Sequence, residues 1–285
     1  MAAVKALYES QCRNFSLARL QRVTLTHDLD AALAAAERRW KRRADQREFV
    51  LHPRIGAGGY AIEVMYRRRL RSEIFLDARL LTELVDPGHP ESCAANIVAH
   101  ELAHVALFNW RDRPASSYVG SSTQEGWRHE VLRYLTLPIW DEYAACRLAA
   151  RSGHPGPVLF NFMGCLRSRL SDGLPQLPRT RRRRWQRRDA VGAFVKVVER
   201  VREPLLTSAY LMGHIDGLGL TTTAPELVTL ARLSPLSPCW PLLHAALHEV
   251  WTHTAPFSLA SLEGLVPALE RAVHICGGRA WLKGI

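Results

Sequence analysis

Long uncharged apolar stretches are missing from this sequence. None of its 285 residues form the run of 18 or more apolar residues that a membrane-spanning helix needs, so we expect no membrane insertion. The chain begins MAAVKALYESQC and reaches Glu9 before any apolar segment, so we expect no secretory signal. Apolar residues make up 47% and charged residues 23%, which excludes general disorder and is typical of a globular protein.

Paired cysteine motifs are also missing. The chain has six widely spaced cysteines and no C-x-x-C sequence, so neither a disulfide framework nor a cysteine-rich metal site is expected. We therefore interpret the cysteines as reduced thiols of a cytoplasmic protein. They are Cys12, Cys93, Cys146, Cys165, Cys239 and Cys276.

Lysine is scarce, yet the net charge is +11, because 34 arginines accompany only 4 lysines. Such an excess suggests a polyanionic partner. Seven of the arginines lie between Arg179 and Arg188, and the rest of the chain carries only +4. In this segment Arg181, Arg182, Arg183 and Arg184 can contact phosphates while Trp185 stacks on a base. A solvated linker explains the same composition, so nucleic-acid contact stays one of two interpretations.

The order of local patterns predicts an α+β fold. A helix capped by Thr26 or Asp28 precedes three strand-like runs at 48–52, 60–66 and 73–81. In the last run, alternating residues predict a half-buried strand. The following segments predict helices over 90–110, 127–135 and 138–151, and a mostly helical region over 190–285.

Four segments follow from this order. We expect an N-terminal helical segment at 1–45 and a core with a small sheet and a central helix at 46–152. A Pro-, Gly- and Arg-rich stretch at 153–189 is typical of a linker, and residues 190–285 form the helical C-terminal region.

The sequence His100-Glu101-Leu102-Ala103-His104 is the strongest chemical signal. On a helix, positions i and i+4 share one face, so His100 and His104 can both bind one Zn²⁺ ion. Glu101 can then act as general base on a zinc-bound water. From Ile97 to Phe108 these three are the only polar side chains, and burying them without a partner would cost several kcal/mol.

A catalytic zinc site needs a third protein ligand. Glu142, 38 residues after His104, is the best candidate, with Asp141 and His129 as alternatives. If its segment is helical, Glu142 shares a face with small residues that let two helices approach closely. These are Ala145, Cys146 and Ala149.

HELAH (100–104) followed by DEYAACRLAA (141–150) resembles the gluzincin arrangement of zinc metallopeptidases, and more narrowly the ImmA/IrrE-type cytoplasmic metallopeptidases. The resemblance covers about residues 60–152. The narrower group differs in the spacing of the two motifs, and often has an acid where this chain has Ala144. The resemblance implies a small sheet packed on the active-site helix, with an edge strand that receives an extended peptide.

These signals predict a zinc-dependent peptidase with a peptide or protein substrate. Its oxyanion stabiliser stays open among four residues: Tyr118, His129, Tyr143 and His214. The alternative is a nucleic-acid-associated protein that uses the Arg179–Arg188 segment and carries a structural or inactive zincin-like domain.

Overall fold

The computed structural model describes residues 9, 16–43, 49–51, 58–66, 69–85, 93–109, 127–173, 187–220, 236–252 and 259–278. The chain divides into two compact units. The first unit comprises Met1–Gly120 and Ala144–Leu159, and the second comprises Ser121–Tyr143 and Phe160–Ile285. The boundary at Tyr143 lies within one continuous helix, so each unit contains a part of that helix.

The first unit is built on a four-stranded sheet with the strand order β1-β4-β3-β2. Strand β1 runs parallel to β4, and the other neighbours are antiparallel. The elements are β1 (Leu20–Thr26), α2 (Leu29–Arg43), β2 (Phe49–Leu51), β3 (Gly59–Tyr66), β4 (Arg69–Asp77), α3 (Arg79–Val85) and α4 (Ala94–Asn109). The α+β class is therefore confirmed, and β1 is a strand that the sequence patterns did not predict.

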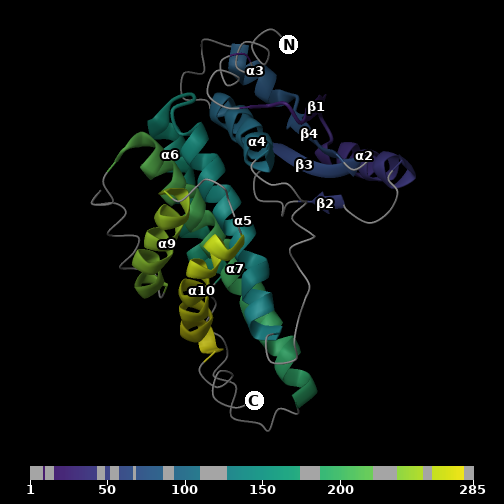
Figure 1. Cartoon of the computed structure of the whole chain (residues 1–285). Helices are drawn as coiled ribbons and strands as arrows, with labels where there is room; N and C mark the ends of the chain where they lie inside the picture. The colour runs from purple at the N-terminus through teal and green to yellow at the C-terminus, as the bar shows by residue number, and fades with distance from the viewer. Residues whose placement is uncertain are drawn as a thin grey trace. The chain divides into compact units, whose positions relative to one another are not determined.

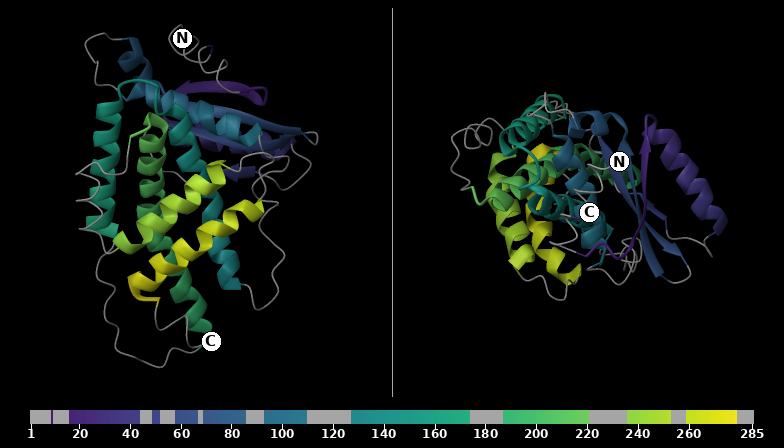
Figure 2. Two further views of the ribbon diagram at one scale, coloured as in Figure 1. Left: turned by 60° about the vertical axis from the view of Figure 1, so that its left-hand side comes forward. Right: turned by 90° about the horizontal axis from the view of Figure 1, so that it is seen from above.

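Helices cover both faces of this sheet (Figures 1 and 2). Ile74 and Leu76 of β4 pack with α4 on one face, whereas Phe75 packs with α2 on the other. The expectation of a half-buried β4 strand was wrong, because Phe75 is only 2% exposed. Phe75 lies on the second face of the strand and is itself apolar. A strand with apolar residues on both faces can be buried between two layers of helices.

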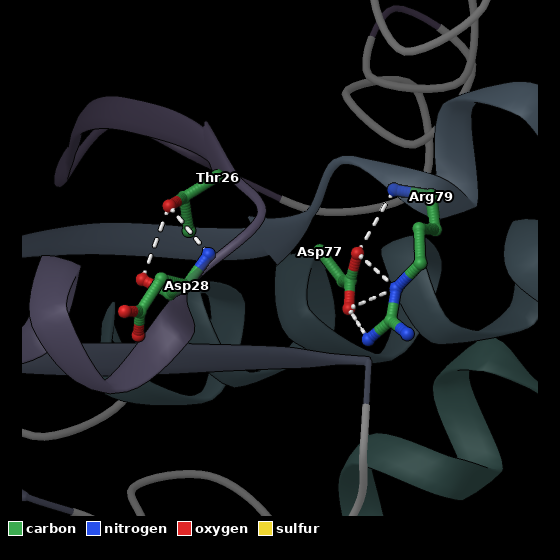
Figure 3. A network of polar contacts seen from close by, with 4 residues as sticks. All are labelled: Thr26, Asp28, Asp77 and Arg79. Carbon is green, nitrogen blue, oxygen red and sulfur yellow. Dashed lines mark hydrogen bonds and ion pairs between the residues drawn. The ribbon is translucent and has the colours of Figure 1, made fainter.

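The strand predicted over 73–81 ends early, at Asp77, and α3 begins at Arg79. The Asp77 carboxylate accepts a hydrogen bond from the backbone N–H of Arg79 at 2.9 Å and further bonds from its guanidinium (Figure 3). Because this carboxylate satisfies a free N–H at the helix start, the chain changes from strand to helix here.

The predicted cap of the first helix is confirmed. Asp28 precedes α2, and its carboxylate accepts the backbone N–H of Ala31 at 2.9 Å. The Thr26 hydroxyl oxygen accepts the backbone N–H of Asp28 at 3.0 Å, which fixes the turn between β1 and α2 (Figure 3).

Residues 127–149 form one helix, α5 (Trp127–Ala149), rather than the two predicted segments. Pro138 lies inside it. Proline removes one backbone hydrogen bond and disfavours a helix interior, which is why the sequence predicts a break there. In the structure the residues that follow Pro138 are almost all buried, so packing outweighs the lost hydrogen bond.

Every element of the second unit that the structure describes is a helix or a helical turn. Helix α7 is the longest, and it contacts α9 and α10 (Figure 1). Besides its part of α5, the second unit contains most of α6 (Pro155–Gly173), α7 (Arg187–Leu218), a 3₁₀ turn (Ser237–Cys239), α9 (Trp240–Thr252), a second 3₁₀ segment (Leu259–Leu265), α10 (Val266–Val273) and a π-helical turn (His274–Gly278). Helix α6 occupies much of the 153–189 stretch, which the sequence predicts as a linker because of its Pro, Gly and Arg content.

In the described part of the chain, no helix is both long enough and apolar enough to cross a membrane.

Candidate metal centre

Helix α4 carries the H-E-x-x-H sequence through the interior of the first unit. The residues that flank His100 and His104 in this helix are mostly Ala, Val and Leu, and this composition favours a helix that is buried on all sides. The side chains of His100, Glu101 and His104 are 8%, 7% and 4% exposed. The three polar residues that the sequence places in an apolar helix are therefore buried in the fold.

The two imidazoles face each other through the same ring atoms. Nε2 of His100 and Nε2 of His104 lie 3.1 Å apart, and the rings meet edge to face with centroids 4.6 Å apart. Two nitrogen ligands at 2.0–2.1 Å in tetrahedral geometry are separated by about 3.3 Å. The pair therefore has the spacing that one zinc ion needs, with little adjustment of either side chain.

Glu142 completes the group. Ligand atoms of His100, His104 and Glu142 all lie within 4.8 Å of one another, and all three residues are buried. A His/His/Glu set is a donor set that zinc binds in catalytic sites. These three residues can hold one metal ion. Asp141, one of the alternative ligands, is also buried but does not join this group. The side chain of His129 lies outside the described residues.

Small residues bring α5 against α4, as the sequence predicts. Ala145 and Ala149 are fully buried. The amide of Asn96 on α4 donates a hydrogen bond to the carbonyl oxygen of Ala149 at 2.9 Å. This bond holds the last turn of α5 against the start of α4, so a carboxylate one or two turns earlier on α5 reaches toward the histidines.

Cys146 contacts the far side of one imidazole. Its Sγ lies 3.5 Å from Nδ1 of His100, and the side chain is 1% exposed. When Nε2 of a histidine binds metal, Nδ1 carries the proton and needs an acceptor. The thiol sulfur is placed to accept that hydrogen bond. The sequence predicts only a packing role for Cys146, because a cysteine is rarely the hydrogen-bond partner of a metal-binding histidine.

Gly59 at the start of β3 lies against Glu101. A Cβ atom added at Gly59 would come 2.8 Å from Cγ and 3.3 Å from Cδ of Glu101, and 3.0 Å from Cδ2 of Leu76. Contacts this short are not tolerated without movement. The strand backbone therefore approaches the glutamate as closely as it does because this position has no side chain. The sequence signal was the GAGG turn at 56–59, which indicates a loop but not this contact.

The structure describes the side chains of two of the four oxyanion candidates, Tyr143 and His214, and both contact residues outside the candidate metal centre. The Tyr143 hydroxyl donates a hydrogen bond to Oδ2 of Asp216 at 2.5 Å. His214 is fully buried and lies edge-on to Phe162, with ring centroids 5.5 Å apart. Tyr118 lies outside the described residues, as does the side chain of His129.

The Arg181–Arg184 segment and Trp185 also lie outside the described residues. Nucleic-acid contact by this segment stays a prediction.

Asp216 near the end of α7 gathers polar groups of the second unit. Its carboxylate accepts the Tyr143 hydroxyl and lies 2.9 Å from Nε2 of His244, and its Oδ2 lies 3.6 Å from Nδ1 of His248. Among the described residues this cluster does not bring three ligand atoms within the spacing of a metal site. His244 and His248, at positions i and i+4 of α9, instead lie beside the carboxylate of Asp216.

Comparisons with models of known protein families, with curated proteins and with solved structures gave no match for this chain. The geometry of the site therefore carries the functional argument.

Proposed function

We propose that this protein is a zinc-dependent peptidase of the zincin class. The observation that carries the proposal is the buried His100/His104/Glu142 group, in which the first histidine is followed directly by Glu101. Two buried imidazoles and a buried carboxylate with ligand atoms this close together are stabilised when they coordinate one divalent metal ion. The H-E-x-x-H sequence on a helix supports zinc rather than another divalent ion.

His100, His104 and Glu142 would hold the ion, and one coordination position would stay open for substrate and water. Bound zinc would supply Lewis acidity, which polarises a carbonyl and lowers the pKa of a coordinated water toward about 7. Glu101 would accept the proton of the attacking water and pass it to the leaving amine. Gly59 lets the strand lie directly against this glutamate, so the carboxylate has little freedom to turn away.

The substrate would be an extended peptide that pairs with β3. Among the described residues, β2 pairs only with Ile62, Glu63 and Val64 of β3. On that side of β3, no described strand pairs with Gly59, Tyr60 or Ala61. Strand addition along this part of β3 would place a peptide carbonyl beside Glu101.

Peptide hydrolysis by the zinc-loaded protein tests the proposal. Wild-type protein should cleave an unstructured substrate such as casein, and Glu101→Gln should lower the rate by about 100-fold or more while zinc stays bound. Glu83→Gln is the matched control, because Glu83 is exposed on α3, and it should retain full activity. A Glu101→Gln protein as active as wild type would refute the assignment of the general base.

A further inference from the structure

A polar cavity of about 370 Å³ lies in the first unit, and none of its lining residues belongs to the candidate metal centre. Three elements supply its wall: β1, α2 and β4. A volume of this size lies within the range of small-molecule sites. The lining residues are Leu20, Gln21, Arg22, Arg39, Trp40, Arg71 and Glu73.

The wall has an excess of positive charge. It contains three arginines and one glutamate, so its net charge is +2. Glu73 is 3% exposed through its side chain and forms an ion pair with Arg39. This pair offsets the charge of Arg39, so the excess belongs to Arg22 and Arg71. Positive charges in the wall of one cavity repel each other, and an anion bound in the cavity would offset that repulsion.

One of these guanidinium groups has an unmet hydrogen-bonding requirement. Nε of Arg71 is buried, and it has no hydrogen-bond partner within the described residues. A buried donor of a charged group that lacks an acceptor destabilises the fold. An anionic ligand that accepts this N–H would remove the cost.

We propose that this cavity binds a phosphomonoester group. A phosphomonoester carries about −1.5 to −2 charges at pH 7, which matches the excess of two positive charges, whereas each phosphodiester carries only one. Arginine suits this ligand, because its planar guanidinium donates paired hydrogen bonds to phosphate oxygens. The volume accommodates the phosphate with an attached sugar-sized group.

The fold assembles this site from basic stretches that lie far apart in the sequence. Arg39 belongs to the RRWKRR stretch at 38–43, and Arg71 ends the RRRLR stretch at 67–71. Taken alone, each stretch is typical of a solvated basic face. In the structure, one arginine of each stretch lines the same cavity.

Calorimetric titration of the full chain tests the proposal, with ribose 5-phosphate, inorganic phosphate and ribose as probes. We expect one ribose 5-phosphate per chain, weaker binding of inorganic phosphate and no binding of ribose. Arg22→Gln and Arg71→Gln should each weaken binding about 10-fold or more. Arg71→Lys keeps the charge but lacks the guanidinium fork, and it should also bind more weakly.

Arg38→Gln and Arg69→Gln are the matched controls, since each removes one exposed charge from α2 or β4 outside the cavity wall. Both should bind as wild type. Equal weakening in the controls would show general charge attraction and overturn the proposal. Tighter binding of a DNA dodecamer without terminal phosphates would overturn the preference for a monoester. Saturable binding should persist in His100→Ala, so loss of the zinc site and loss of this site are distinguishable.

Discussion

Replacing Gly59 by alanine should reveal the contact between β3 and the proposed general base. In a strand without a steric conflict, Gly→Ala raises stability by about 0.5–1 kcal/mol. Here the new Cβ would lie 2.8 Å from Cγ of Glu101 and 3.0 Å from Cδ2 of Leu76. Overpacking of this kind costs about 1–3 kcal/mol. We therefore expect Gly59→Ala to destabilise the protein, with a sign opposite to the intrinsic preference.

A double-mutant cycle isolates the share that belongs to Glu101. Glu101→Ala removes Cγ and Cδ, two of the three atoms nearest to a Cβ at position 59, and leaves the contact with Leu76. The cost of Gly59→Ala should fall by about 1 kcal/mol or more in the Glu101→Ala background. Urea denaturation followed by circular dichroism measures all four free energies of unfolding.

The control is Gly58→Ala. The atoms nearest to a Cβ at Gly58 would belong to Ile97, at 3.0 Å, and Leu80, at 3.5 Å, rather than to Glu101. Its cost should be the same with and without the Glu101 side chain. If Gly59→Ala also costs the same in both backgrounds, the strand does not restrain Glu101 and the reasoning is refuted.

Three further outcomes are expected. Hydrogen bonds from Arg79 lower the pKa of Asp77 from 3.8 to about 2, so this carboxylate stabilises the fold above pH 4 and loses that effect as the pH falls toward 2. Asp77→Asn should therefore show a smaller loss of melting temperature between pH 4 and pH 2 than wild type, and parallel curves would contradict this. Cys146→Ala removes the sulfur 3.5 Å from Nδ1 of His100 and should weaken zinc binding about 10-fold in a chelator competition, whereas unchanged affinity would show that the thiol does not orient the ring. For the alternative function, a gel shift with DNA should be salt-dependent and lost when Arg181–Arg184 are neutralised; no shift at low salt would remove that alternative.

The sequence predicted most of the site, because its signals are local. H-E-x-x-H places two imidazoles on one face of a helix through the helical period alone. Glu142 required one more step, the expectation that small residues bring α5 close to α4, and the Asn96 to Ala149 hydrogen bond agrees with it. Gly59 and Cys146 could not be assigned their contacts from the sequence. Their partners lie on other elements, and neither residue type indicates such a partner.

The errors in the fold also come from long-range packing. Strand β1 has a mixed pattern, LQRVTLT, with three exposed residues in its first half, and its pairing with β4 makes it a strand. The strand predicted over 73–81 failed at its end, because the Asp77 carboxylate starts a helix at Arg79. The break predicted at Pro138 failed because burial of the following residues outweighs one lost hydrogen bond.

Metal content of the purified protein tests the central claim most directly. Wild-type protein dialysed against zinc should hold one tightly bound ion per chain by mass spectrometry of the metal. His100→Ala and Glu142→Gln should lose it or bind it far more weakly, whereas Glu101→Gln should keep it. A wild-type protein without stoichiometric zinc, or equal zinc in His100→Ala, would contradict the account.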